Sequence, residues 1–271
     1  MTAQEKLQNK LNSGRHITVG LDTDVKKIPQ HLLTEKDPVL KFNEIIIEST
    51  CEYAASYKLN LAFYEKDGSR GLDLLQKTMK AIPNDILIIG DAKRGDIGNT
   101  SQMYAESIFG HFKFDAVTLH PYMGFDSVEP FLKYDDRLNF MLALTSNPGS
   151  QDFEKMELKS GRFLYQEVIS KVKDWNKKDN CGIVFGATNE KELLENVGSF
   201  GDLSVLLPGI GAQGGSLEGV VSAFKGSRKE KFLINVSRGL IYKDQSRGFH
   251  EAVKQEIISL NNKVSKVWNS I

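Results

Sequence analysis

The chain has 271 residues, of which 40% are hydrophobic and 26% charged, with 35 basic and 35 acidic side chains. A chain with no net charge and an isoelectric point near 7.0 lacks a general electrostatic footprint for nucleic acid or for an anionic membrane. Its polar first residues show no signal-peptide core, and its longest apolar stretches are too short to span a bilayer. We therefore expect a cytoplasmic protein that attracts any anionic ligand through a few local cations.

Eight short runs rich in β-branched and apolar residues recur along the chain, and they are typical of strands that are buried on both faces. The predicted strands are His16–Leu21, Tyr57–Ala62, Asp85–Ala92, Asp115–His120, Asn139–Thr145, Cys181–Gly186, Leu203–Pro208 and Lys231–Ser237.

An amphipathic helical pattern follows each run. The predicted helices are Pro38–Ala55, Ser69–Ile82, Thr100–Gly110, Asp126–Tyr134, Gly161–Lys177, Asn189–Val197, Leu217–Phe224 and Phe249–Trp268. Asp126 is predicted to be the N-cap of its helix. The first dozen residues and the segment Asp152–Lys159 show no function in the sequence.

Eight strand–helix units in a chain of this length predict an α/β protein, a (β/α)8 TIM barrel that occupies residues 1–271 as one domain. The alternative is an open doubly wound sheet, which has fewer strands. The two cysteines, Cys51 and Cys181, match no metal-ligand spacing and are expected to be buried thiols rather than a disulfide. In a barrel the active site lies where strands end and helices begin.

The third predicted strand ends in Asp91-Ala-Lys93-Arg-Gly-Asp96. Side chains two residues apart on a strand share a face, so Asp91 and Lys93 are expected to project together, with Asp96 in the following loop. The carboxylates would keep Lys93 protonated and oriented, as a general acid requires. Taken alone, the pattern is also compatible with a salt bridge on the solvated rim.

Neighbouring strands add opposite charges. Lys58 lies within the second apolar run, where an unpaired ammonium is costly, and Asp22 ends the first run. Asp22, Lys58, Asp91 and Lys93 would then alternate in charge across adjacent strands. Asp24 competes with Asp22 for that role, and Asp22 could equally be a turn or cap residue.

The last two strands end in features that suit an anion. The glycine-rich segment Pro208–Gly215 follows the seventh strand, and Arg238 follows the eighth. Barrels frequently bind phosphate in these loops, and arginine can grip phosphate through two donors. Residues Gly209–Gly214 match the GxGxxG dinucleotide pattern, but they do not follow the first strand of a βαβ unit, so we reject that reading. Ser146 lies in a polar turn after the fifth strand, which could bind a neutral heterocycle.

The segment Asp91–Thr100 resembles the signature of orotidine 5′-phosphate decarboxylases, and matching features follow in the expected order from Asp22 to Arg238. Tyr57–Glu65 and Thr145–Gly149 are similar to the longer bacterial type. The resemblance implies decarboxylation of orotidine 5′-phosphate to UMP in de novo pyrimidine synthesis, with neither a metal nor an organic cofactor.

The resemblance also implies roles for individual residues. Lys93 would donate the proton to C6 of the pyrimidine. Asp91 and Asp96 would flank the substrate carboxylate, and Lys58 would complete the charge network. Asp96 and Thr100 would reach the site of a neighbouring subunit, which implies a homodimer.

Further residues would bind the substrate by the same resemblance. Asp22 and Lys58 would contact the ribose. Ser146 and Gln213 would bind the pyrimidine, while Gln213 and Arg238 would contact the phosphate. The expected substrate-binding set is Asp22, Thr100, Ser146, Pro208, Gln213 and Arg238.

Two other functions share parts of this pattern. A related barrel that acts on sugar phosphates would carry Asp-x-Lys-x-x-Asp but would depend on a divalent metal. The Arg-Gly-Asp-Ile-Gly continuation and Lys58 argue against it. A catalytically inactive nucleotide-binding barrel would bind UMP without turnover, and the intact Lys93 argues against that reading.

Overall fold

A ring of eight parallel strands forms the centre of the computed structural model, which describes residues 1–211 and 214–270. The strands pair in sequence order and β8 closes on β1. They are β1 Ile17–Gly20, β2 Ser56–Asn60, β3 Leu87–Arg94, β4 Ala116–Leu119, β5 Leu138–Leu144, β6 Cys181–Phe185, β7 Ser204–Leu207 and β8 Phe232–Val236. All eight predicted strands are present, so the barrel is confirmed and the open sheet is excluded.

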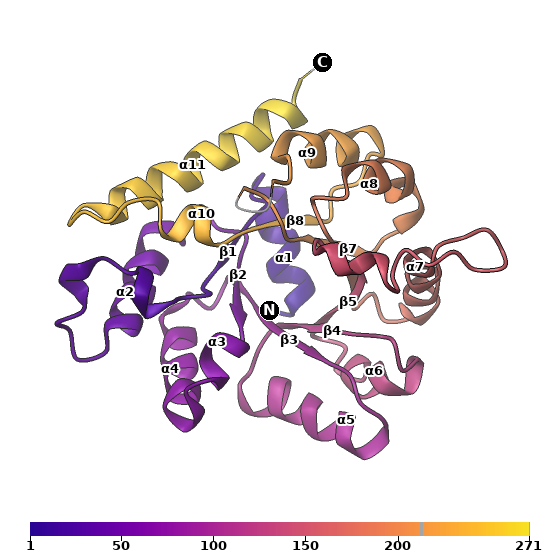
Figure 1. Ribbon diagram of the computed structural model, residues 1–271, viewed down its shortest axis with the longest axis horizontal. Coiled ribbons are helices and arrows are strands. Elements are labelled where there is room, and N and C mark those ends of the chain that lie inside the picture. The colour runs from indigo at the N-terminus through magenta and orange to yellow at the C-terminus, as the bar shows by residue number, and fades with distance from the viewer. Residues whose placement is uncertain (212–213, 271) are drawn as a thin grey trace.

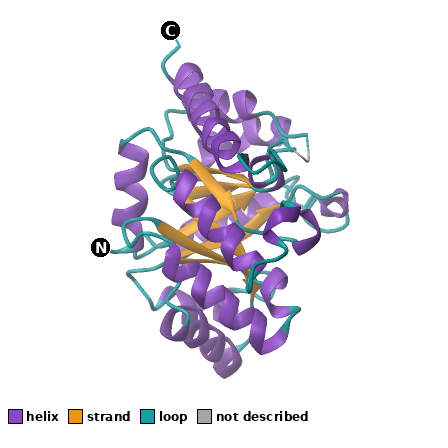
Figure 2. Ribbon diagram, turned by 90° about the vertical axis from the view of Figure 1, so that its left-hand side faces the viewer, coloured by secondary structure: helices purple, strands orange, loops and turns teal. Residues whose placement is uncertain are grey.

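Helices surround this ring, and α1 lies behind its centre in the view of Figure 1. They are α1 Ala3–Asn12, α2 Pro38–Thr50, α3 Ala62–Glu65, α4 Gly68–Ala81, α5 Gly98–Ala105, α6 Phe125–Leu132, α7 Leu164–Trp175, α8 Glu190–Asn196, α9 Leu217–Gly226, α10 Arg238–Ile241 and α11 Phe249–Trp268. In the perpendicular view the strands are enclosed between helices (Figure 2).

The apolar core has two parts because each strand buries both of its faces. Side chains on the outer face of the barrel, such as Ile17 and Val19, pack with the surrounding helices. Side chains of the interior, such as Ile89, Phe140 and Leu206, form a separate cluster. Both cysteines are free thiols, Cys181 buried and Cys51 partly buried.

Helix α1, which the sequence analysis did not predict, closes one end of the barrel. Its residues Ala3, Leu7 and Leu11 are buried against the interior cluster. Lys6 pairs with Asp115 at 2.9 Å, and Lys10 pairs with Asp85 at 2.6 Å. The first dozen residues therefore have a structural role, which is to cover the amino-terminal ends of the strands.

The predicted start of α6 is wrong. The helix begins at Phe125, and its N-cap is Gly124, whose φ of 93° lies in the left-handed region that favours glycine. Asp126 lies instead in the first turn, where its negative charge complements the helix dipole. The helix predicted from Thr100 also begins earlier, at Gly98, and from Glu106 it continues as a π-helical turn to His111.

Candidate active site

A cavity of about 310 Å³ opens at the carboxyl-terminal ends of the strands. Side chains from distant parts of the sequence line it, among them Asp22 after β1, Lys58 on β2, Asp91 on β3 and Arg238 after β8. The barrel brings them together because all its strands are parallel and end at the same face.

Lys58 lies between two carboxylates. Its Nζ is 2.9 Å from Oδ2 of Asp91 and 3.5 Å from Oδ1 of Asp22. Ser237 donates a hydrogen bond of 3.0 Å to the other oxygen of Asp22. The predicted alternation of charge across the strands is therefore present. Asp24 is not part of it, because its side chain caps the turn Val25–Lys27 by accepting from the Lys26 amide.

Opposite charges keep this buried network ionised. Burial alone would lower the pKa of Lys58, but the carboxylates of Asp91 and Asp22 outweigh burial and raise it. Burial would likewise raise the pKa of Asp91, but the ammonium groups of Lys58 and Lys93 hold it well below its usual range. Asp91 is thus a fixed carboxylate at the base of the cavity.

Lys93 lies at the rim, with its Nζ 2.5 Å from Oδ1 of Asp91 and about half of its side chain exposed (49%). Lys93 and Asp91 are in contact, as predicted, but the regular alternation of side chains along a strand is not what brings them together. The pairing of β3 with β4 shifts register between Gly90 and Arg94, and Lys93 has a φ of 47°. A bulge, rather than a regular strand, directs the side chain of Lys93.

The opposite side of the cavity carries the features that suit an anion. Pro208, Gly209 and Arg238 line it, with Arg238 exposed at the first position of α10. Gln213 lies outside the described residues, so the structure does not place it.

Ser146 lines the cavity next to Thr145, at the end of β5. The Thr145 amide and hydroxyl both donate to the carboxylate of Glu154, over 2.6 Å and 2.9 Å. The segment Asp152–Lys159 therefore helps to fix the end of β5, a role that the sequence did not indicate.

Asp96 and Thr100 do not line the cavity of their own barrel. The side chain of Asp96 accepts a hydrogen bond from the Ile97 amide, and Thr100 is exposed on α5. The resemblance places both residues at the site of a neighbouring subunit, and that role stays a prediction.

The sequence of the chain matches a protein-family model, described as "Orotidine 5'-phosphate decarboxylase / HUMPS family", over residues 16–252. The chain belongs to this family. A relative from Porphyromonas gingivalis named orotidine 5′-phosphate decarboxylase is 47% identical over 252 residues, which cover 92% of this chain and 91% of the relative. One with the same name from Flavobacterium johnsoniae is 41% identical over 273 residues and covers 100% and 99% of the two chains.

Solved structures of this decarboxylase family share the barrel. The OMP decarboxylase of Leishmania donovani matches with a TM-score of 0.81 and 35% identity, covering 97% of this chain and 99% of that one. A further structure, from Toxoplasma gondii and titled a putative orotidine-monophosphate-decarboxylase, matches with a TM-score of 0.84 and 32% identity.

Sequence reasoning missed three polar residues that line the cavity of this family member: Asn60, Thr118 and Asn235. Each lies on or at the end of an apolar strand, which is the same signal that identified Lys58. The Oδ1 atoms of Asn235 and Asp22 are buried and have no hydrogen bond within the described residues, although the Lys58 ammonium lies 3.5 Å from the Asp22 oxygen. These oxygens are suited to accept hydrogen bonds from a hydroxylated ligand.

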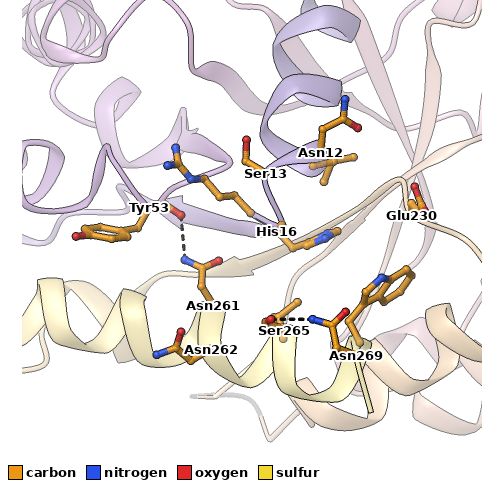
Figure 3. Close-up of a pocket in the computed structure, with 14 residues that line it drawn as sticks. Asn12, Ser13, His16, Tyr53, Glu230, Asn261, Asn262, Ser265 and Asn269 are labelled. Carbon is orange, nitrogen blue, oxygen red and sulfur yellow. Dashed lines mark hydrogen bonds between the residues drawn. The ribbon is translucent and has the colours of Figure 1, made fainter. Parts of the chain in front are cut away.

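A larger cavity of about 650 Å³ lies at the opposite end of the barrel, between the start of β1 and α11 (Figure 3). Asn261 donates there to the carbonyl of Tyr53, and Asn269 donates to Ser265. No ion pair involves any residue that lines it, within the described part of the chain. Ion-paired lysine and aspartate side chains line the smaller of these two cavities, so we assign the active site to it.

Residues 1–211 and 214–270 contain no helix that is long and apolar enough to cross a membrane. They also contain no group of three or more histidine, cysteine, aspartate or glutamate side chains arranged to hold a metal ion.

Proposed function

We propose that this chain decarboxylates orotidine 5′-phosphate to UMP, with Lys93 as the proton donor and residues 1–271 acting as one barrel domain. The observation that carries the proposal is the chain of alternating charges, Asp22, Lys58, Asp91 and Lys93, along one side of the cavity. Membership of the decarboxylase family supports the same reaction.

The chemistry requires a cation where a carbanion develops. When the bond between C6 and the carboxylate breaks, its electron pair stays on C6 and carbon dioxide leaves. An ammonium fixed beside C6 stabilises that pair and then delivers a proton to it, which forms the new C–H bond. Lys93 becomes a neutral amine and recovers its proton from solvent.

Asp91 orients the donor in this scheme. Its Oδ1 accepts from Lys93, while its Oδ2 accepts from Lys58. The carboxylate therefore cannot turn away from Lys93 without losing the hydrogen bond to Lys58. Asp91 is proposed to hold the ammonium of Lys93 in the position where the proton is needed.

The remaining polar groups would bind the rest of the substrate. The Oδ1 of Asp22, which lies 3.5 Å from the Lys58 ammonium, would accept from a ribose hydroxyl. Arg238 and the glycine-rich loop that begins at Pro208 would bind the phosphate, and Ser146 the pyrimidine. Gln213 is proposed to contact pyrimidine and phosphate by family resemblance alone.

The test follows the ultraviolet change as orotidine 5′-phosphate becomes UMP, with excess EDTA present. Conversion that EDTA does not slow is expected, because the proposed step uses an ammonium rather than a metal. Lys93→Ala should lower kcat at least about 100-fold, the usual contribution of a positioned general acid. Lys77→Ala, which removes an exposed lysine on α4, is the control and should leave kcat unchanged. No conversion by folded protein, or a fully active Lys93→Ala variant, would contradict the proposal.

A homodimer with shared sites is the second part of the proposal. Helices α5 and α6 are neighbours in the fold (Figure 1), and six exposed apolar side chains lie on them or on the residues just before them. This α5–α6 apolar patch consists of Ile97, Met103, Tyr104, Tyr122, Met123 and Phe125. Asp96 and Thr100 are adjacent to it in the sequence, so a partner seated on the patch would meet both. Covering these exposed side chains with a partner would remove apolar surface from water, which favours association.

Mixing two inactive variants tests the shared site. If Asp96 serves the partner's cavity, a heterodimer of Lys93→Ala and Asp96→Asn subunits carries both defects in one site and none in the other. Random exchange should then restore about a quarter of wild-type activity. Exchanged subunits that recover no activity, or a monomer in sedimentation, would contradict this arrangement.

A further inference from the structure

The bulge in β3 faces a single residue of β4. Residues 91–93 of β3 lie opposite the single residue Thr118, which is buried (2% exposed) and lines the active-site cavity. The paired residues on either side are Gly90 with Val117, and Arg94 with Leu119. Bulges of this kind often redirect a side chain next to an active site.

Thr118 makes two hydrogen bonds to this bulge. Its Oγ1 accepts from the backbone N–H of Lys93 at 3.1 Å and donates to Oδ1 of Asp91 at 2.8 Å. The same Asp91 oxygen accepts from the Lys93 Nζ at 2.5 Å. The three residues thus form a closed ring of hydrogen bonds that fixes Lys93 at both its backbone and its ammonium.

The ring holds a backbone conformation that a lysine does not favour. Lys93 has a φ of 47°, in the left-handed region where the β-carbon crowds the backbone. Such a residue keeps its conformation only when its surroundings determine it. The hydrogen bond from its amide to Thr118 is the contact that closes the bulge against β4.

We propose that Thr118 is a positioning residue for the decarboxylation, because its hydroxyl holds the Lys93 backbone and the Asp91 carboxylate in the geometry of proton delivery. This inference rests on the proposed role of Lys93. Thr118 acts through these two residues and needs no contact with the substrate.

The charge of the site does not depend on Thr118. The ammonium groups of Lys58 and Lys93 account for the low pKa of Asp91, so Asp91 stays ionised without the hydroxyl. Loss of the hydroxyl should therefore change orientation rather than ionisation. The expected signature is a lower kcat with the same pH dependence and with unchanged binding of UMP.

Valine and serine separate the hydroxyl from the shape of the side chain. Valine has nearly the shape of threonine but can neither donate nor accept, whereas serine can do both. Thr118→Val should lower kcat between about 10-fold and 100-fold, as expected for a small misplacement of a catalytic group. Thr118→Ser should restore most of the loss.

Thr18→Val is the matched control. Thr18 is a fully buried threonine on β1, whose hydroxyl is hydrogen-bonded to Ser56 at 2.6 Å, so this variant loses a comparable bond away from Lys93. It should leave kcat unchanged. If Thr118→Val does not yield folded protein, the comparison of Thr118→Ser with Thr118→Ala gives the same contrast.

The double variant distinguishes this inference from the proposed function. Because Thr118 acts through Lys93, Thr118→Val should not lower further the residual activity of Lys93→Ala. A Thr118→Val variant as active as Thr18→Val, beside an inactive Lys93→Ala, would overturn the positioning role alone. A fully active Lys93→Ala would overturn the proton donor and the positioning role together. A raised KM with an unchanged kcat in Thr118→Val would also overturn the positioning role of Thr118.

Discussion

Replacing Lys58 by methionine should destabilise the barrel far more than the loss of an ordinary lysine. The ammonium is buried at 2.9 Å from one carboxylate and 3.5 Å from another. With an effective dielectric constant of about 20, these distances correspond to attractions of about 6 and about 5 kcal/mol before the desolvation cost. Removing one partner of a buried pair leaves charge uncompensated and typically costs about 3–5 kcal/mol, which is the loss we expect.

Equilibrium urea unfolding at neutral pH measures this loss as a difference in the free energy of unfolding. Lys77→Met is the matched control, because the Lys77–Asp73 pair is exposed on α4, and its loss should cost no more than about 0.5 kcal/mol. A Lys58→Met variant within about 1 kcal/mol of wild type would refute the reasoning. It would mean that the fold tolerates the buried carboxylates of Asp22 and Asp91 without the Lys58 ammonium.

Three further outcomes are expected. Since the pKa of Asp91 is depressed in the folded state, the stability that its ionised carboxylate gives to the fold should be complete above about pH 4 and be lost as the pH falls further. The urea midpoint should therefore fall less between neutral pH and about pH 3 in Asp91→Asn than in wild type. Arg238→Ala should raise KM more than it lowers kcat if Arg238 binds phosphate, and a change confined to kcat in steady-state assays would argue otherwise. Gly20→Ala should lower the thermal unfolding midpoint, because the added carbon would lie 1.8 Å from the Ser237 hydroxyl. Gly226→Ala, where the added carbon would meet open space, should leave the midpoint unchanged. Equal midpoints for the two variants would contradict the crowding at Gly20.

The barrel itself could be predicted from the sequence because a parallel strand buried on both faces is apolar without interruption. Lys58 was detectable for the same reason, since a charge inside such a run needs a partner nearby. The partners then followed from the order of the strands in a closed barrel, and both are in contact with Lys58.

Features that depend on pairing between strands could not be predicted. The bulge at Lys93 is a mismatch between β3 and β4, and neither strand alone carries a signal for it. Thr118 was missed as well, although a hydroxyl within the apolar run of β4 was visible.

Two misses were local, and the first of them had a signal in the sequence. Thr2 and Glu5 form a capping box at the start of α1, and the pattern of threonine followed three residues later by glutamate is present in the sequence. Ala3, Leu7 and Leu11 then recur at intervals of four residues. At α6, a glycine with positive φ occupies the capping position, and no side-chain rule identifies it over the nearby Asp126.

The way α1 is attached has a consequence for the order of assembly. Lys10 and Lys6 of α1 are anchored to residues 75 and 109 positions further along the chain. Contacts of such separation form slowly because a long loop must be closed first. We therefore expect the end of the barrel that α1 covers to be completed late, after β3 and β4 have come together. A variant that weakens α1 should accordingly speed unfolding more than it slows the early steps of folding.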